Sequence, residues 1–187
     1  SNVKINQGDG ALLGDMFPEK FDKVLVDAPC SSEGIIRYKS HKFFEWTLLD
    51  VYRNARTQRK LIASGFKALK PGGTLVYSTC TYAPEENESV VDFLLQKIDS
   101  AEIGPVQFAG IKKRDGLVRW GDLEFDRRLV NSIRIYPPDN DSIGIFIAKI
   151  NKNPSPSAQE PCPASRDKNP SLHSGTWSPR KLGDKGC

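Results

Sequence analysis

The sequence predicts an open α/β fold in which strands alternate with helices. Three segments favour this fold: an apolar strand at Phe21–Asp27, a long amphipathic helix at 48–69, and a second β-rich run at 74–78. A strand, a helix and a strand in this order form a βαβ unit, in which a right-handed crossover makes the strands parallel. The continuous apolar character of Phe21–Asp27 is typical of a parallel strand that helices bury.

The sequence signals for the other helices and strands are weaker. Residues 3–6 suggest a short strand, and Pro-Gly-Gly at 71–73 predicts the end of the long helix. That helix has an apolar side with Leu49, Tyr52, Leu61, Ala68 and Leu69, and a solvent side with Arg53, Arg56, Arg59 and Lys60. A further helix is expected at 84–97, where the glutamates at 85, 86 and 88 suit the positive N-terminal end. Strands at 132–136 and 144–150, joined by turns at 137–142, predict a closing antiparallel hairpin.

Composition divides the chain near residue 150. The 187 residues are 38% hydrophobic and carry a net charge of +4, which permits a nucleic-acid partner without requiring one. Residues 1–150 contain the apolar patterns and form one expected domain, whereas 151–187 are rich in Pro, Ser, Lys and Asn and predict a disordered tail. The sequence contains no run of about 18 apolar residues, so it predicts no membrane-spanning helix. The four cysteines lack metal-ligand spacing, so we expect no metal.

Chemistry-bearing residues follow both strands of the βαβ unit. Asp27 and Cys30 come directly after the first strand, and Cys80 comes directly after the second. The carboxyl ends of parallel strands meet at one edge of a sheet, where open α/β folds bind ligands. We therefore expect the two thiols to lie close together although fifty positions separate them.

Two motifs carry a family resemblance: Asp-Ala-Pro-Cys-Ser-Ser-Glu-Gly at 27–34, and Ser-Thr-Cys-Thr at 78–81 followed by Pro-Glu-Glu-Asn-Glu at 84–88. Together with segments 134–137 and 144–149, they resemble the Sun-type (Fmu, Nop) RNA cytosine-C5 methyltransferases over about residues 3–150. The resemblance implies a Rossmann-like sheet that uses S-adenosylmethionine. It also implies methylation of cytosine C5 in rRNA or tRNA through a covalent Cys–C6 adduct.

The resemblance assigns a role to each site residue. Cys80 is the implied nucleophile, Cys30 the thiol that assists proton handling and release, and Asp27 the carboxylate that faces the cytosine. For the cofactor it implies Asp27, Pro29 and Asp9, the last facing adenine. A basic patch of Arg37, Lys39, His41 and Lys42 follows the Pro-Cys motif, and Arg37 and Lys39 are expected to contact RNA phosphate.

The chain also departs from the family pattern. The glycine-rich loop and acidic residue of the first strands, which hold the cofactor in the family, have no counterpart here. The resemblance therefore implies a partial catalytic domain whose N-terminal strands are missing. Ser32 stands where many members have glycine. We further expect a monomer that is located in the cytoplasm, or in the nucleus, nucleolus or mitochondrion if the source is a eukaryote.

Several alternatives stay open at this point. Either cysteine taken alone is more often a small buried apolar residue, and the pair could form a disulfide. Asp27 and Asp9 also suit turns, the glutamates at 85–88 suit helix capping, and the basic patch suits a solvated loop. At the level of function, the alternatives are a fragment that binds RNA or a partner without turnover, and a methyltransferase that acts on DNA cytosine.

Overall fold

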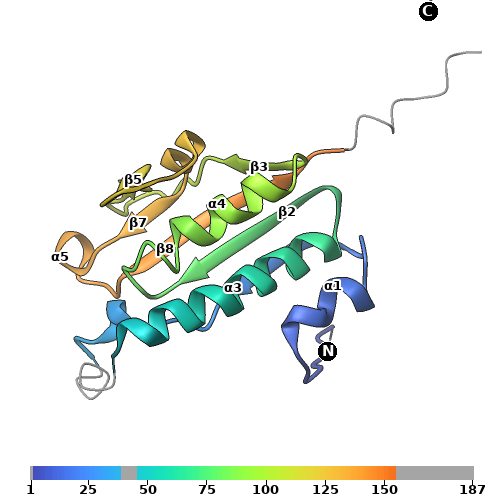
Figure 1. Ribbon diagram of the computed structural model, residues 1–187, viewed down its shortest axis with the longest axis horizontal. Coiled ribbons are helices and arrows are strands. Elements are labelled where there is room, and N and C mark those ends of the chain that lie inside the picture. The colour runs from blue at the N-terminus through green and yellow to red at the C-terminus, as the bar shows by residue number, and fades with distance from the viewer. Residues whose placement is uncertain (1, 39–45, 155–187) are drawn as a thin grey trace, which may run out of the picture. The chain divides into compact units, whose positions relative to one another are not determined.

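The computed structural model describes residues 2–38 and 46–154, which lie in the compact unit Ser1–Ser157. Strand β1 (Phe21–Asp27), helix α3 (Leu48–Ala68) and strand β2 (Leu69–Thr79) form the predicted βαβ unit (Figure 1). The two strands are parallel, with Asp27 paired to Ser78. The fold prediction for this unit is therefore confirmed.

The sheet continues with antiparallel strands. β8 (Ile145–Lys152) lies beside β2, and its other side pairs with β7 (Ile133–Ile135) and β3 (Ala101–Gly104). β4 (Arg114–Asp115) extends the sheet beyond β7, while β5 (Arg119–Trp120) and β6 (Leu123–Glu124) form a separate ribbon. The antiparallel β7–β8 pair confirms the expected hairpin. β8 reaches Lys152, so Asn151 and Lys152 belong to the sheet, and 155–187 of the expected tail lie outside the described residues.

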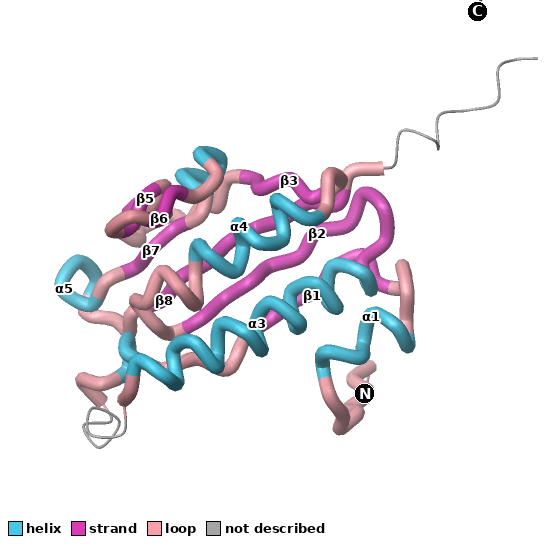
Figure 2. The backbone as a smooth tube through the Cα atoms, in the orientation of Figure 1, coloured by secondary structure: helices cyan, strands magenta, loops and turns pink. Residues whose placement is uncertain are grey.

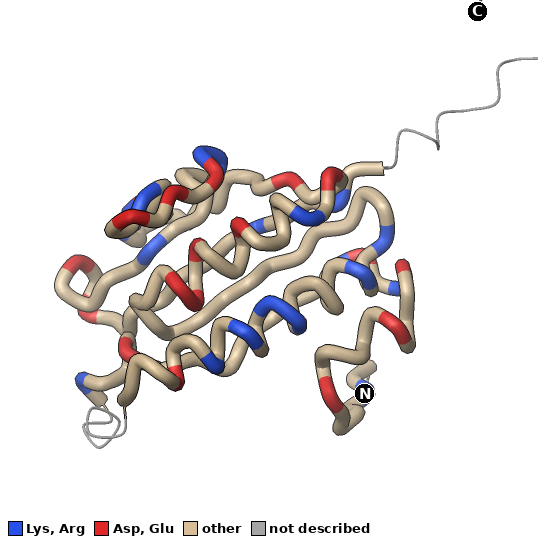
Figure 3. Tube along the Cα trace, viewed as in Figure 1, with Lys and Arg blue, Asp and Glu red and all other residues tan. Residues whose placement is uncertain are grey.

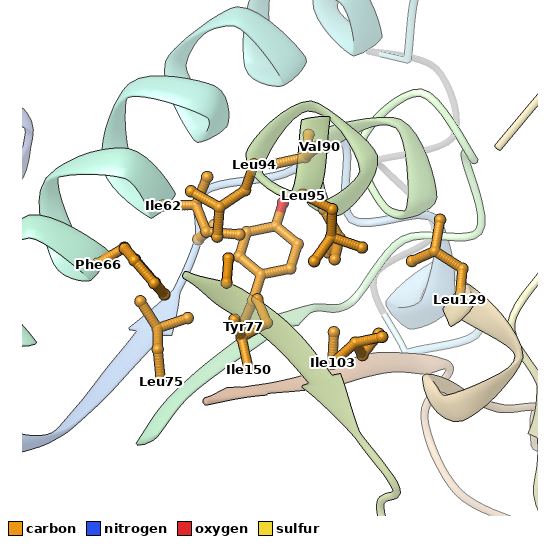
Figure 4. Close-up of a cluster of buried hydrophobic side chains, with 14 of the residues drawn as sticks. Ile62, Phe66, Leu75, Tyr77, Val90, Leu94, Leu95, Ile103, Leu129 and Ile150 are labelled. Carbon is orange, nitrogen blue, oxygen red and sulfur yellow. The ribbon is translucent and has the colours of Figure 1, made fainter. Parts of the chain in front are cut away.

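Helices α3 and α4 (Glu88–Lys97) cross one face of the sheet (Figures 1 and 2). Figure 4 shows Tyr77 of β2 among side chains of both helices, including Ile62 of α3 and Leu94 of α4. All three side chains are fully buried. Burial of one such Leu or Ile side chain stabilises the fold by roughly 1.5–3 kcal/mol. This core holds the βαβ unit and thereby fixes the relative position of its two strand ends.

The buried stripe of α3 differs from the predicted one. Thr47 caps the helix by accepting a hydrogen bond from the Asp50 amide, and the buried positions Val51, Ala55, Gln58 and Ile62 follow the helical period. Leu49 and Tyr52 are 56% and 55% exposed, so their assignment to the apolar side was wrong. They face away because Val51 already points into the core, and a helix presents a single stripe to a sheet.

The basic side of α3 is largely as expected. Figure 3 shows Lys and Arg gathered along this helix, and Arg53, Arg56 and Lys60 are exposed. Arg59 instead lies half-buried, where its guanidinium donates to the Ser89 hydroxyl and lies over the Phe93 ring. In the described part of the chain, no helix is both long and apolar enough to span a bilayer.

Other predicted boundaries shift. Helix α3 ends at Ala68 because Leu69 already takes extended angles, so Pro-Gly-Gly at 71–73 lies inside β2. There the β1–β2 register shifts, and Gly72 supplies a positive φ of 79° that suits this irregularity. Residues 3–6 form no strand, and helix α4 begins at Glu88 after turns at 84–87.

Short helices fill the connections. They are η1 (Gly10–Leu12), α1 (Leu13–Met16), η2 (Glu33–Ile35), η3 (Arg127–Asn131) and α5 (Pro137–Asn140). The last of these replaces part of the turn-rich segment expected at 137–142. Its proline at the first helical position is preorganised for a helix start, which explains why proline-rich sequence is helical here.

Candidate active site

Two thiols lie together at the carboxyl ends of β1 and β2. The Sγ atoms of Cys30 and Cys80 are 3.4 Å apart. Parallel pairing continues up to the loops, because the Ala28 amide donates to the Ser78 carbonyl at 3.0 Å. The backbone of the βαβ unit therefore delivers both cysteines to one place, as the strand order predicts.

The contact between the two sulfur atoms shifts the pKa values of the two cysteines in opposite directions. The pKa of Cys80 is lowered to about 6 by the hydrogen bond from the Cys30 thiol, with further help from the Ser32 hydroxyl and against the cost of burial. The pKa of Cys30 is raised by the same bond to Cys80 and by its deeper burial. At neutral pH this arrangement gives a thiolate at Cys80 and a thiol at Cys30. A thiolate is the attacking form of cysteine.

The Pro-Cys loop turns sharply after Cys30. Ser32 has a φ of 62° in the left-handed region, and its hydroxyl donates to the Cys30 carbonyl at 3.2 Å. Residues with a Cβ rarely adopt this conformation, so a glycine would be less strained at this position. The Gly34 amide then donates to the Cys80 carbonyl at 2.8 Å and ties the two loops together.

Glu33 braces the loop that carries Cys80. One carboxylate oxygen accepts from the Thr81 hydroxyl and from the Tyr82 amide, both at 2.9 Å. Sequence reasoning gave Glu33 no role of its own. Its position inside the Pro-Cys motif, three residues after Cys30, was the available signal.

Two glutamates of the 84–88 motif make contacts beyond the helix capping that their position suggested. Glu86 and Glu88 are fully buried. Glu86 accepts hydrogen bonds from the Pro-Cys loop, and Glu88 forms an ion pair with Arg134 of β7. Glu88 does lie in the first turn of α4, where its charge suits the helix dipole as expected, whereas Glu86 precedes the helix and its bonds go to the Pro-Cys loop, so the capping interpretation was wrong for Glu86.

Asp27 and Pro29 are exposed beside the thiols. The Asp27 carboxylate accepts one hydrogen bond, from the Ser78 hydroxyl at 3.0 Å, and keeps further oxygen lone pairs for a ligand. Both residues can therefore contact a molecule bound at this edge.

Asp9 and Arg37 lie in other surroundings. Asp9 caps η1 by accepting from the Ala11 amide at 2.9 Å, and the described contacts do not connect it to either cysteine. Arg37 is exposed and pairs with Asp141 at 2.8 Å, an interaction weak enough for a phosphate to replace. Lys39, the other expected RNA contact, lies outside the described residues.

Comparison with known families gives one family match over most of the chain. Residues 1–151 match the family model described as 16S rRNA methyltransferase RsmB/F. A tRNA (cytosine(49)-C(5))-methyltransferase of Pyrococcus abyssi is 46% identical over 151 residues, which are 80% of this chain and 47% of the relative. Ribosomal RNA small subunit methyltransferase F of Klebsiella pneumoniae is 41% identical over 165 residues, 88% of this chain and 32% of the relative.

Solved structures show the same likeness. A methyltransferase homolog protein from Pyrococcus horikoshii matches with a TM-score of 0.69 and 34% identity, over 81% of this chain and 45% of that one. NSun6 from Pyrococcus horikoshii, solved with SFG, matches with a TM-score of 0.63 and 32% identity, over 82% of this chain and 35% of that one. The mixed α/β sheet is thus that of methyltransferase structures. The chain spans less than half the length of the two relatives named above.

Proposed function

Since the chain belongs to the RsmB/F family of 16S rRNA methyltransferases, we propose that it carries the cytosine-activating half of an RNA cytosine-C5 methyltransferase. The observation that carries this proposal is the contact of the Cys30 and Cys80 sulfurs at 3.4 Å, a geometry in which the hydrogen bond between them lowers the pKa of Cys80. A thiolate beside a second thiol and an exposed carboxylate suits covalent activation of an electron-poor ring.

The chain's own residues account for the steps on the base. The Cys80 thiolate adds to C6 of cytosine, which breaks the C5–C6 double bond and places negative charge at C5. Asp27, at the rim of the site, hydrogen-bonds the N3 and amine edge and stabilises the adduct. Once Cys80 is bonded to C6 it is no longer a thiolate, so the hydrogen bond that raises the pKa of Cys30 is lost and Cys30 can release its own proton to solvent. After C5 has been methylated, the Cys30 sulfur accepts the C5 proton, the C–H electron pair restores the C5–C6 double bond, and Cys80 leaves C6 as a thiolate.

S-adenosylmethionine is the proposed cofactor, and it supplies the methyl group when bound. Asp27 and Pro29 are the residues that would contact it, because both are exposed at the strand ends beside the thiols. The negative charge of the Asp27 carboxylate suits the positive sulfonium. Asp9 is proposed for the adenine, on family resemblance alone.

The proposed substrate is a cytosine in rRNA or tRNA, the RNA classes on which the named relatives act. Stacking in a duplex covers the C6 face, so the base must be unpaired or extruded. Arg37 and Lys39 are proposed to contact the neighbouring phosphates. We expect a reducing compartment such as the cytoplasm, where both thiols stay free.

We further infer that β1 is an inner strand in the whole protein. In the described part of the chain β1 forms an edge of the sheet, and its Leu25 is 68% exposed. Leu25 also lines a hollow of about 580 Å³ together with Val76 and Lys149. The Leu25 side chain lies on the face of the sheet away from α3 and α4, whereas the unpaired backbone groups along the outer side of β1 are those that an added strand would pair. Amide hydrogen exchange of β1 that is as fast in the whole protein as in this chain would contradict the inference.

Two measurements test the proposed function. Calorimetric titration with S-adenosylmethionine shows whether this chain binds the cofactor, and bisulfite sequencing after incubation with RNA or DNA shows where methylcytosine forms. We expect methylcytosine in RNA, and none with Cys80→Ala. Methylation confined to DNA overturns the proposal. Absence of both cofactor binding and methylation would favour the alternative that these residues bind RNA without turnover.

A further inference from the structure

A buried polar bridge holds the backbone on both sides of Cys30. The side-chain amide of Gln58, on α3, donates to the Pro29 carbonyl at 2.7 Å. The Ser31 amide donates to the two carboxylate oxygens of Glu86 at 3.2 and 3.1 Å. The Gln58 amide also donates to Glu86 at 2.7 Å, so the two side chains close a ring around the Cys30 backbone.

The orientation of Gln58 is determined by its neighbours. Its amide nitrogen lies between a carbonyl and a carboxylate, both of which are acceptors, so a flipped amide would put three acceptors together. Glu86 is held in turn by the core, because the Tyr77 hydroxyl donates to its backbone carbonyl at 2.6 Å. The bridge is therefore anchored on α3 and on β2.

Burial of the polar side chains that form this bridge opposes folding. Gln58 and Glu86 are both fully buried, and burial raises the pKa of Glu86 against the lowering effect of its bonds to Ser31 and Gln58. The second amide atom of Gln58, Oε1, has no hydrogen-bond partner among the described residues. An unsatisfied buried acceptor destabilises the folded state. Apolar side chains at these positions would leave the Pro29 carbonyl and the Ser31 amide without these partners, so the bridge serves the backbone of the loop that carries Cys30 rather than the packing of the core.

We propose that Gln58 and Glu86 are positioning residues that hold the Cys30 thiol in hydrogen-bond contact with Cys80. This inference rests on the proposed function, in which that contact makes Cys80 the nucleophile. The described contacts of Gln58 and Glu86 go to the loop backbone and to each other, not to either sulfur. Their effect on the chemistry is therefore transmitted through the Pro29 and Ser31 peptide groups.

The test measures the alkylation of Cys80 by iodoacetamide as a function of pH, with mass spectrometry to identify the modified cysteine. The variants are Gln58→Leu, which removes the donor to Pro29, and Glu86→Gln, which keeps the size of the side chain. Glu85→Gln is the matched control, because no hydrogen bond or ion pair among the described residues involves the Glu85 carboxylate. Circular dichroism and thermal melting establish that each variant is folded.

The sign of the shift separates positioning from a simple field effect. Loss of positioning weakens the Cys30–Cys80 bond, so the midpoint for Cys80 should rise by about one pH unit or more in both variants. Removal of the Glu86 charge without loss of position would lower the midpoint, since one negative charge fewer favours a thiolate. An unchanged or lowered midpoint in folded Glu86→Gln overturns the proposal, and so does an equal rise in the Glu85→Gln control.

The alkylation assay requires neither RNA nor cofactor. A shifted midpoint therefore supports positioning even if the chain does not methylate RNA, and the two proposals can fail separately. If Gln58→Leu does not fold, Glu86→Gln and the more conservative Gln58→Met still test whether Gln58 and Glu86 position Cys30. In a preparation that methylates RNA, the same variants should lower kcat and leave the KM for RNA unchanged.

Discussion

The thiols of Cys30 and Cys80 contact each other at 3.4 Å across two loops that α3 separates in sequence. Because the buried thiol can donate to the more exposed one, the contact stabilises the charge on Cys80 and opposes a charge on Cys30. The same geometry therefore brings the cysteines together and differentiates them. In the sequence, the assignment of Cys80 as nucleophile and Cys30 as its helper rests on family resemblance alone.

The first prediction concerns this charge. Cys80 should be alkylated with a midpoint near pH 6, and the rate should fall as pH drops through that value, because a lowered pKa means that the thiolate persists down to it. In Cys30→Ala the hydrogen bond is absent, and the midpoint should move up toward that of an ordinary thiol. Alkylation followed by mass spectrometry measures both. Equal midpoints in the two proteins would contradict the proposed role of the contact.

The second prediction separates attack from release. With an RNA that the protein methylates, Cys30→Ala should accumulate a covalent protein–RNA adduct, because the Cys80–C6 bond forms and is not resolved. Cys80→Ala should form no adduct, since the attacking sulfur is gone. A denaturing gel detects the adduct as a slower band that ribonuclease removes. Accumulation with Cys80→Ala in place of Cys30→Ala would reverse the two roles.

The βαβ unit and the meeting of the cysteines could be predicted because they depend on local patterns. Phe21–Asp27 has the same bounds as strand β1, since its apolar run ends where the polar loop begins. A parallel crossover leaves little choice about which strand ends meet. The faces of α3 were harder to assign: Leu49 is apolar yet exposed, and Gln58 is polar yet buried. Position relative to the sheet decides both, and periodicity alone does not give it.

The buried carboxylates could not be predicted because their partners are distant in sequence. Glu88 is a plausible helix-capping residue until Arg134, 46 positions later, is seen beside it. Glu86 is likewise explained by Ser31 and Gln58, which belong to other elements. A solvated glutamate and a buried, paired one have the same local sequence, so only the tertiary structure distinguishes them.

The third prediction concerns the buried pair of Arg134 and Glu88. Arg134 Nε donates to Glu88 at 2.7 Å, a second bond joins the same groups, and the side chains are 4% and 0% exposed. Arg134→Met leaves the Glu88 charge buried and unpaired, and should cost about 3–5 kcal/mol in the free energy of unfolding. Arg134→Met with Glu88→Gln should recover part of this loss.

Urea denaturation measures the stability of both Arg134 variants. The control is Arg114→Met, which breaks an ion pair with Asp139 on the surface and should cost less than about 1 kcal/mol. Similar losses for Arg134→Met and Arg114→Met would show that burial does not determine the importance of the Glu88 pair.

The fourth prediction concerns Gly34, where three backbone segments meet. A Cβ at this position would lie 2.4 Å from the Gly144 carbonyl oxygen and 2.9 Å from that of Cys80, and neither backbone can withdraw easily. Gly34 also donates to Cys80 and accepts from the Gly144 amide. Gly34→Ala should therefore push the Cys80 loop away and cost about 1–3 kcal/mol or more in unfolding free energy.

Gly8 supplies the matched control for Gly34, because a Cβ there meets nothing within 4 Å. Gly8→Ala should leave stability within about 0.5 kcal/mol of the parent chain. The displacement of the Cys80 loop by Gly34→Ala should also weaken the thiol contact, so that the alkylation midpoint of Cys80 rises along with the loss of stability. A Gly34→Ala protein that is as stable as Gly8→Ala, with an unshifted midpoint, would show that the loops yield without disturbing the thiols.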